Sequence, residues 1–204
     1  MEKCEISKST LGRIPYYVDY IASLPDDIQN VSATRIAKEL GFGEIQVRKD
    51  LAQICKNGKP KVGYDRLDLK TNLVDFLSNL NGRAIIVGAG QLGNALLNYD
   101  GFEIYGTQIL AAFDSDEKKE YLSPSGKSIL PMDQMKDFCK KNNINIGIIT
   151  TPSRAAQTVL NQLCECNIKR IWCFAPCRLY KPADVTVQYE NLALSLAHLN
   201  LINK

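Results

Sequence analysis

The feature that most restricts the fold is a glycine-rich segment between a strand-like and a helix-like stretch. Residues 83–87 (RAIIV) are mostly apolar and end in three β-branched residues. Gly88, Gly90 and Gly93 follow, and a helical pattern continues to Leu97. Further strand-like and helix-like stretches alternate after it, at residues 109–113, 132–141, 146–150, 154–166 and 170–174. This alternation is typical of a parallel sheet with crossover helices and predicts a Rossmann-type α/β domain.

The glycine spacing fits a loop that holds a pyrophosphate. Gly88 would permit the tight turn, Gly90 the close approach of the phosphates, and Gly93 the packing of the next helix. Asp114 ends the following strand (LAAFD), 21 residues after Gly93. Its carboxylate would accept bonds from both ribose hydroxyls and repel a 2′-phosphate, so the pattern favours NAD(H) over NADP(H). The alternative is a glycine turn with a purely structural role.

Two short segments stand immediately after predicted strands, where open α/β sheets bind their ligands. They are Thr150, Thr151 and Pro152, and Phe174, Ala175 and Pro176. Phe174 would pack against a nicotinamide ring, or it is an ordinary core aromatic at a strand end.

The first 80 residues show helical periodicity instead. Ser32 is a candidate N-cap for a helix that ends at Gly41, and a second helix is predicted over residues 44–55. Two helices joined by a tight glycine turn, the second with cationic and amide groups in its first turns, form the helix-turn-helix pattern. Residues 56–64 (KNGKPKVGY) follow as a Gly- and Pro-containing hairpin with three lysines, which has the form of a wing.

Positive charge is concentrated in this part of the chain. Residues 48–70 hold seven Lys and Arg against three Asp, whereas the whole chain has a formal net charge of only +3. Such a local excess suits phosphate binding, because each neutralised phosphate releases counterions, and Arg and Gln can read purine edges. The alternative is a helical pair with a solvated cationic face.

Composition argues against several other classes. A chain of 204 residues is too short for a large multidomain enzyme. No apolar stretch approaches the roughly 18 residues of a membrane-spanning helix, and the amino terminus lacks a signal-peptide core, so we expect no membrane association and a cytoplasmic location. Seven scattered cysteines favour reduced thiols, and a single His without repeated CxxC pairs argues against zinc.

Catalytic groups are also missing from the pattern. His198 is the only histidine, and no Tyr has a Lys four residues later, so the short-chain dehydrogenase pair is absent. With no room for a substrate domain, we expect a cofactor-binding protein that is not an enzyme. A small NAD-dependent Rossmann oxidoreductase and a nucleotide-binding regulatory module that acts through protein partners remain alternatives. Thiol oxidation at Cys173 and Cys177, which flank Phe174–Pro176, is a minor further possibility.

A set of short motifs spans the chain: Arg13-Ile14-Pro15-x-Tyr17, Gln46-Val47-Arg48-Lys49-Asp50-Leu51, Gly58-Lys59, Val62-Gly63-Tyr64, Gly88-x-Gly90-x-Leu92-Gly93-x-Ala95-Leu96, Ala112-Phe113-Asp114 and Phe174-Ala175-Pro176-x-Arg178-Leu179. Together with the domain order and length, they resemble the Rex family of bacterial redox-sensing transcriptional repressors, over essentially the whole chain. The resemblance implies a homodimer that binds a palindromic DNA operator when the NADH/NAD⁺ ratio is low and releases it when NADH binds.

The resemblance also implies site residues and domain limits. DNA contacts would come from Gln46, Arg48, Lys49, Lys59, Lys61 and Tyr64. Cofactor contacts would come from Gly88, Ala89, Gly90, Gln91, Leu92, Gly93, Tyr99, Asp114, Ser115, Thr150, Thr151, Pro152, Phe174, Ala175 and Pro176, and Tyr99 would sense the redox state of the nicotinamide. Residues 1–80 would form a winged helix-turn-helix DNA-binding domain, 81–186 a Rossmann NAD(H)-binding domain, and 187–204 a helix swapped into the partner subunit.

Several positions depart from the family pattern. The wing reads Gly58-Lys59-Pro60-Lys61 where a GKRG-like run is usual, and Cys55 replaces a common glycine. Two further departures concern the coupling between the domains. Many members carry an arginine near position 19 and an aspartate near position 191, and this pair couples the DNA-binding domain to the swapped helix. The present chain has Asp19 and Asn191 there. The sequence alone leaves two alternatives open, a weakened coupling and a coupling through other residues.

Overall fold

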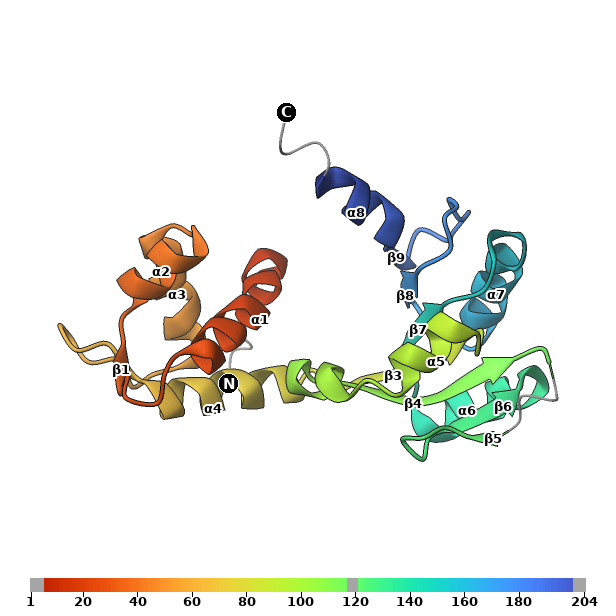
Figure 1. The fold of residues 1–204 in the computed structure, drawn as a ribbon, viewed down its shortest axis with the longest axis horizontal. Helices are drawn as coiled ribbons and strands as arrows, with labels where there is room; N and C mark the ends of the chain where they lie inside the picture. Colours follow the sequence, from red (N-terminus) through yellow and green to blue (C-terminus); the bar gives the residue numbers. More distant parts are fainter. Residues whose placement is uncertain (1–5, 117–120, 200–204) are drawn as a thin grey trace. The chain divides into compact units, whose positions relative to one another are not determined.

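The computed structural model describes residues 6–116 and 121–199 (Figure 1). Its contacts group into two compact units. The first runs to Asn81 and also includes Ile104–Gly106, and the second contains Gly82–Glu103 and the chain from Thr107 onward. Each unit has apolar cores of its own.

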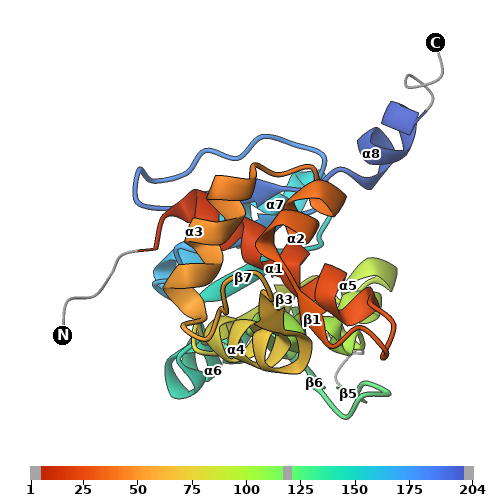
Figure 2. The ribbon, with the colours of Figure 1, turned by 90° about the vertical axis from the view of Figure 1, so that its left-hand side faces the viewer.

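The first unit is helical, with one two-stranded sheet. Its elements are α1 (Lys8–Ser23), β1 (Asn30–Val31), α2 (Ala33–Leu40), α3 (Glu44–Ile54), β2 (Tyr64–Asp65) and α4 (Arg66–Ser78). The strands β1 and β2 pair antiparallel and flank the helix pair. The core consists of buried apolar side chains from α1 to α4, among them Ile14, Ile36, Leu51 and Leu73. Figures 1 and 2 show α1, α2 and α3 grouped together.

Local signals explain the helix-turn-helix. The Ser32 Oγ accepts a hydrogen bond from the Arg35 N–H at 3.1 Å and thereby caps α2. Gly41 ends the helix with φ 68°, a left-handed conformation that glycine adopts without a Cβ penalty. α3 then begins after Gly43 and ends at Ile54, one residue before the predicted limit. The predicted winged helix-turn-helix fold is confirmed.

The second unit is built on a seven-stranded sheet in the order β5-β6-β4-β3-β7-β8-β9. The strands are β3 (Gly82–Val87), β4 (Thr107–Asp114), β5 (Tyr121–Leu122), β6 (Ser128–Pro131), β7 (Ile146–Ile149), β8 (Arg170–Cys173) and β9 (Thr186–Tyr189). All neighbouring strands run parallel except β5, which pairs antiparallel with β6. The predicted Rossmann-type sheet is confirmed, although the sequence did not indicate β5, β6 and β9.

Helices cover both faces of this sheet, because the side chains of a strand alternate between the faces. Ile85 and Val87 pack in one cluster with residues of α6 (Met135–Asn142) and α7 (Ser153–Glu165). Ala84 and Ile86 pack in another with Leu97 of α5 (Gln91–Leu97). The remaining helical elements are η1 (Asp100–Tyr105), η3 (Met132–Gln134) and α8 (Leu192–Leu199).

The helix α8 leaves the end of β9 and points away from the sheet (Figures 1 and 2). The leucines that the sequence places on its apolar faces are all exposed: Leu192, Leu194, Leu196 and Leu199. Within the described residues, no helix has both the length and the apolar character that a membrane crossing requires.

Candidate DNA-binding surface and dinucleotide site

The second helix of the helix-turn-helix, α3, has one buried face and one exposed face. Val47 and Leu51 are buried in the core of the first unit, whereas Gln46, Arg48 and Lys49 are exposed. Arg48 also forms an ion pair with Glu44, one turn earlier on the exposed side. The three predicted DNA contacts of α3 therefore lie on the surface, where a ligand can reach them.

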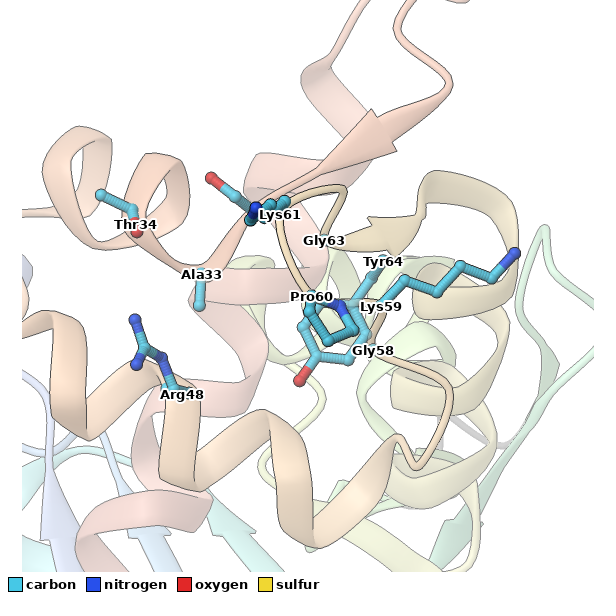
Figure 3. A pocket seen from close by; sticks show the side chains of 10 residues that line it. Ala33, Thr34, Arg48, Gly58, Lys59, Pro60, Lys61, Gly63 and Tyr64 are labelled. Atoms are coloured by element: carbon cyan, nitrogen blue, oxygen red, sulfur yellow. The ribbon is translucent and has the colours of Figure 1, made fainter.

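Four of the six predicted DNA-contact residues line one cavity. This cavity of about 630 Å³ lies between α3 and the hairpin at residues 58–64, and Arg48, Lys59, Lys61 and Tyr64 all line it. Figure 3 shows Arg48 pointing from α3 towards the start of α2, with the Tyr64 ring under the turn at Pro60 and Lys59 extending away from Arg48. Three cations around an open cavity form a surface suited to phosphates.

The hairpin, which we call the wing (residues 58–64), has a tightly defined backbone. Lys59 and Gly63 exchange two backbone hydrogen bonds of 2.8 and 2.9 Å. Lys61 has a φ of 65°, so the turn presents its side chain from a left-handed conformation. Gly63 has a φ of 94°, and a Cβ there would lie 2.5 Å from the Val31 carbonyl oxygen. The β1–β2 pairing thus requires a glycine at the base of the wing.

Gln46 and Lys49 line a different depression on the other side of α3, beside α1. Its floor contains a buried polar network that the sequence analysis missed. The Asp50 carboxylate accepts hydrogen bonds from the Thr10 hydroxyl (3.0 Å), from Arg13 Nε and Nη2 (2.8 and 2.9 Å) and from the Tyr17 hydroxyl (2.7 Å). The sequence contains a signal for this network, because the charged Asp50 falls on the same, buried helical face as Val47 and Leu51.

This network changes the ionisation of its members. Burial raises the pKa of Asp50, but the hydrogen bonds from its three partners outweigh burial, so the pKa lies below its usual value. Burial and the bond to Asp50 raise the pKa of Tyr17. The bond to Asp50 likewise raises the pKa of Arg13. At neutral pH the network is therefore a closed ion pair that connects α1 to α3.

In the second unit, a cavity of about 800 Å³ opens at the carboxyl ends of β3, β4 and β7. The predicted cofactor residues that line it are Gly88, Gly90, Asp114, Ser115, Thr150, Thr151 and Pro152. The sequence analysis did not foresee its further lining residues, Met132, Arg154, Thr158 and Gln162. Most of them belong to α7, whose pattern marks it only as an amphipathic helix.

The glycine loop is shaped by close packing. A Cβ on Gly93 would lie 1.9 Å from the Gly88 carbonyl oxygen, so the start of α5 can approach the loop only with glycine there. Gly88 has a φ of 108°, and a Cβ on it would come within 3.0 Å of the backbone at Thr150 and Thr151. A Cβ on Gly90, in contrast, would meet nothing within 4 Å. Gly90 therefore leaves open space beside the loop.

Two polar groups at this cavity bear on what it can hold. Asp114 Oδ2 accepts the Ala89 N–H at 2.7 Å, and Oδ1 accepts the Asp116 N–H at 3.0 Å, so the carboxylate is fixed against the glycine loop. The Thr151 hydroxyl is buried and has no hydrogen-bond partner in the described structure, which is costly unless a ligand or solvent supplies one. An open glycine cradle, a fixed carboxylate and an unsatisfied hydroxyl together fit a dinucleotide.

The structure does not bring all predicted cofactor residues to this cavity. Ala175 and Pro176 line a separate cavity of about 590 Å³ with Tyr189, Asn191 and Leu194, near the start of α8. Tyr99 is 58% exposed and does not line the glycine-loop cavity.

Aromatic rings lie beside these segments. The Tyr99 ring packs edge-on against Phe102 with centroids 5.0 Å apart, and Phe102 packs against Trp172 at 5.8 Å. The Trp172 ring in turn lies 4.5 Å from that of Phe174. Tyr99 and Phe174 are thus the ends of one aromatic chain within the second unit.

Asp19 and Asn191, which the sequence analysis singled out, have local partners. The Tyr105 hydroxyl donates a hydrogen bond to the Asp19 carboxylate, and Tyr105 packs against the core of the first unit. Gly106 follows with a φ of 72°, where a Cβ would lie 1.9 Å from the Leu77 carbonyl oxygen. Asn191 Oδ1 accepts the Leu194 N–H at 3.0 Å and thereby caps α8.

Cys55, Cys139 and Cys173 are buried free thiols of low reactivity. Burial raises the pKa of the Cys55 thiol to about 11 and that of Cys139 to about 12, and it also raises the pKa of Cys173. These thiols are therefore protonated at neutral pH, when thiolate is the nucleophilic form. Among the described residues, no group of His, Cys, Asp and Glu side chains is placed to hold a metal ion.

Two family models match the sequence. Residues 79–177 match a family described as "CoA binding domain". Residues 5–52 match a family described as "Putative DNA-binding protein N-terminus". The two matches fall on the nucleotide-type fold and on the helix-turn-helix, respectively.

Curated relatives and solved structures align over almost the whole chain. The redox-sensing transcriptional repressor Rex of Clostridioides difficile is 36% identical over 201 residues, which is 98% of this chain and 96% of that protein. Rex of Clostridium botulinum is 37% identical over 206 residues, which is 100% of this chain and 98% of that protein.

The Rex-family repressor RSP, solved in complex with β-NAD⁺ and operator DNA, superposes with a TM-score of 0.81 at 30% identity over 98% of this chain and 94% of that one. In complex with β-NADH it superposes with a TM-score of 0.79, over 98% and 95%. Because identities above 30% to repressors of this kind extend over nearly the full length, this chain belongs to the Rex family of redox-sensing transcriptional repressors.

Proposed function

We propose that the protein is a DNA-binding repressor that senses the NADH/NAD⁺ ratio and has no catalytic activity of its own. It binds a palindromic operator at low NADH and releases it when NADH binds. The observation that carries this proposal is the presence in one chain of a basic cavity between α3 and the wing and of a glycine-loop cavity at the carboxyl ends of parallel strands. Its relative RSP has been solved with both nucleotides and with operator DNA.

The DNA-binding part of the proposal assigns two kinds of contact. Gln46, Arg48 and Lys49 project from α3 and would meet the major groove, where Arg and Gln side chains recognise guanine and adenine edges. Lys59, Lys61 and Tyr64 of the wing would contact the sugar-phosphate backbone or the minor groove. The domain limits proposed for these contacts and for the cofactor are residues 1–80 and 81–186.

The cofactor part assigns the pyrophosphate to the loop Gly88–Gly93, which includes Ala89, Gln91 and Leu92, and to the start of α5. Asp114, with Ser115 beside it, would accept the hydroxyls of the adenosine ribose. Thr150, Thr151 and Pro152 would line the cleft, and the unsatisfied Thr151 hydroxyl is available to the ligand. NAD(H) would supply a ring that is charged when oxidised and neutral when reduced.

The sensing part depends on that difference in charge. A ligand shifts an equilibrium only if its affinity differs between the two states. Phe174, Ala175 and Pro176 offer an apolar environment, which disfavours burial of the charged nicotinamide ring and favours the neutral one. Tyr99, at the far end of the same aromatic chain, would respond to the position of that ring.

A homodimer completes the proposal. The exposed leucines of α8 would pack on the partner subunit, with residues 187–204 as the swapped segment. A dimer presents two recognition helices to two half-sites about one helical turn apart. The DNA on which a bacterial transcriptional repressor acts lies in the cytoplasm, so the proposed location is the cytoplasm.

The test is fluorescence anisotropy at one fixed salt concentration. A labelled palindromic duplex, selected by the protein from a randomised palindromic library, is titrated with protein alone, with NADH and with NAD⁺. We expect NADH to weaken binding about tenfold or more and NAD⁺ to leave it unchanged. Arg48→Ala should lose affinity for the duplex, whereas Asp114→Ala should bind it and lose the response to NADH.

The outcomes separate the two halves of the proposal. If the protein selects no duplex, the assignment of the basic cavity to DNA is wrong. If the protein binds the duplex with the same affinity in the presence of NADH and of NAD⁺, the assignment of a sensing role is wrong. Consumption of NADH with any added carbonyl substrate would overturn the statement that the protein is not an enzyme.

A further inference from the structure

The first turn of the recognition helix exposes one large apolar side chain. Ile45 is the second residue of α3 and is 72% exposed, more than any other described Leu, Ile or Val. It lines the depression on this side of α3 together with Gln46, Lys49 and Gln53. The side chain therefore lies among amide and cationic groups, and it contributes nothing to the core of the unit.

Exposure alone would not assign a role, because single apolar residues are common on protein surfaces. The position of Ile45 on the recognition helix supplies the argument for a role. Base edges in helix-turn-helix complexes are contacted by the first turns of the recognition helix. Ile45 shares its exposed side of α3 with Lys49, four residues later, whose charge suits the phosphates that flank a groove.

The chemistry of DNA then selects the partner. The major groove presents donors, acceptors and one apolar group, the C5 methyl of thymine. An aliphatic side chain offers no hydrogen bond to the base edges, and the thymine methyl group is the apolar group on which it can pack. We infer that Ile45 is a specificity-determining residue that packs on a thymine methyl group in each half-site. This inference depends on the proposed DNA-binding function.

The experiment removes the methyl group without changing base pairing. The palindromic duplex selected by the protein is remade with deoxyuridine in place of thymidine, one symmetric pair of positions at a time, and the Kd is measured by anisotropy. For the unmodified protein we expect one symmetric pair of positions at which this substitution weakens binding about tenfold. One lost methyl contact should raise the Kd about fourfold, and the two losses in the pair are partly compensated by the rest of the interface.

The variant Ile45→Ala tests whether this side chain is responsible. It should bind the thymidine duplex about tenfold more weakly than the unmodified protein, and deoxyuridine at the sensitive pair should have no further effect. Leu67→Ala removes a 62% exposed leucine from α4 of the same unit and serves as the matched control, with affinity and deoxyuridine sensitivity unchanged. Equal thermal unfolding of the three proteins shows that the fold is retained.

Two results would overturn the inference while leaving DNA binding intact. One is an unmodified protein that binds every deoxyuridine duplex as tightly as the thymidine duplex. The other is an Ile45→Ala variant that keeps the full deoxyuridine sensitivity. Failure to select any duplex would instead refute the proposed function, and the inference with it.

Discussion

Asp50 lies on the buried side of α3 and accepts hydrogen bonds from three side chains of α1. A buried carboxylate is stabilising only when its partners compensate for lost hydration, and here Arg13 supplies both charge and two donors. The network therefore fixes the angle between α1 and the recognition helix. One residue away, Lys49 faces outward, so the same turn of helix holds a structural charge and a candidate DNA contact.

We predict that Asp50→Asn lowers the free energy of unfolding at pH 7 by about 3 kcal/mol, because it leaves the Arg13 guanidinium without its anion in a largely buried place. Because the folded pKa of Asp50 lies below its usual value near 4, the unmodified protein should lose this contribution as the pH falls below about 4. The variant should lack that acid-dependent loss. Urea unfolding at several pH values measures both effects.

The control for this prediction is Asp26→Asn. Asp26 pairs with Arg66 but is fully exposed, so its removal should have little effect on stability. Equal stability losses in the two variants would contradict the role assigned to the buried network.

Two glycines of the loop should respond oppositely to the same substitution. Gly93→Ala places a Cβ 1.9 Å from a backbone oxygen, so we expect it to destabilise the second unit by about 1–3 kcal/mol or more. Gly90→Ala meets nothing within 4 Å and should leave thermal unfolding unchanged, but its methyl group occupies the space assigned to the pyrophosphate. NADH fluorescence titration should then show at least about tenfold weaker binding. Normal NADH affinity in Gly90→Ala would refute that assignment.

At the scale of elements, the wing is a short turn whose base is stabilised by backbone hydrogen bonds. Its two ends are joined by the hydrogen bonds between Lys59 and Gly63, and β2 pairs with β1 directly beyond it. The side chains of residues 59–62, which form the tip of the wing, do not belong to the core of the unit. Substitutions at the tip should consequently change DNA binding without changing stability.

We predict that Lys61→Ala weakens DNA binding to a similar extent on all sequences and lowers the slope of log Kd against log salt concentration by about 1, as expected for one lost phosphate contact. Its left-handed backbone is equally unfavourable for Lys and Ala, so stability should not change. Anisotropy titrations at several salt concentrations give the slope. Lys140→Ala, an exposed lysine of α6, is the control, and a slope that stays constant in Lys61→Ala would exclude a phosphate contact there.

The segment Ile104–Gly106 belongs to the first unit, although the chain before and after it belongs to the second. η1 begins at Asp100 in the second unit and ends at Tyr105, which packs against the core of the first and bonds to Asp19. The close approach of Gly106 to Leu77 holds the segment against the end of α4. Asp19 thus has a partner within its own chain.

At the scale of the whole molecule, the exposed leucines of α8 are the largest departure from a self-contained fold. Burial of a leucine side chain is worth about 1.5–3 kcal/mol, so a helix that exposes four of them gains from a partner surface. The proposed homodimer would supply that surface from a second copy.

We predict that the double variant Leu192→Glu with Leu196→Glu weakens the dimer about a hundredfold or more, because two leucines on one face of α8 would leave the interface. Sedimentation velocity over a range of protein concentrations measures the change. Leu122→Glu, an equally exposed leucine of β5, should leave the association unchanged. A double variant that sediments like the unmodified protein would show that α8 does not form the interface.

Local patterns in the sequence determined most of the architecture. The Ser32 cap, the left-handed Gly41 and the spacing of apolar residues define α2 and α3 because each acts within a few residues of the helix that it specifies. The strand, glycine loop and helix at residues 83–97 are likewise a local unit. The short strands β5 and β9 escaped prediction because two to four residues are too few to give a periodic signal.

Only the tertiary structure decided which distant groups meet. It gave Asp50 its partners from α1, placed Ile104–Gly106 with the first unit, brought α7 to the glycine-loop cavity, and separated Ala175 and Pro176 from that cavity. These contacts join residues tens of positions apart, and each depends on the packing of several elements at once. Helix caps and periodicity determine which elements form, whereas the free energy of packing determines which of their side chains come together.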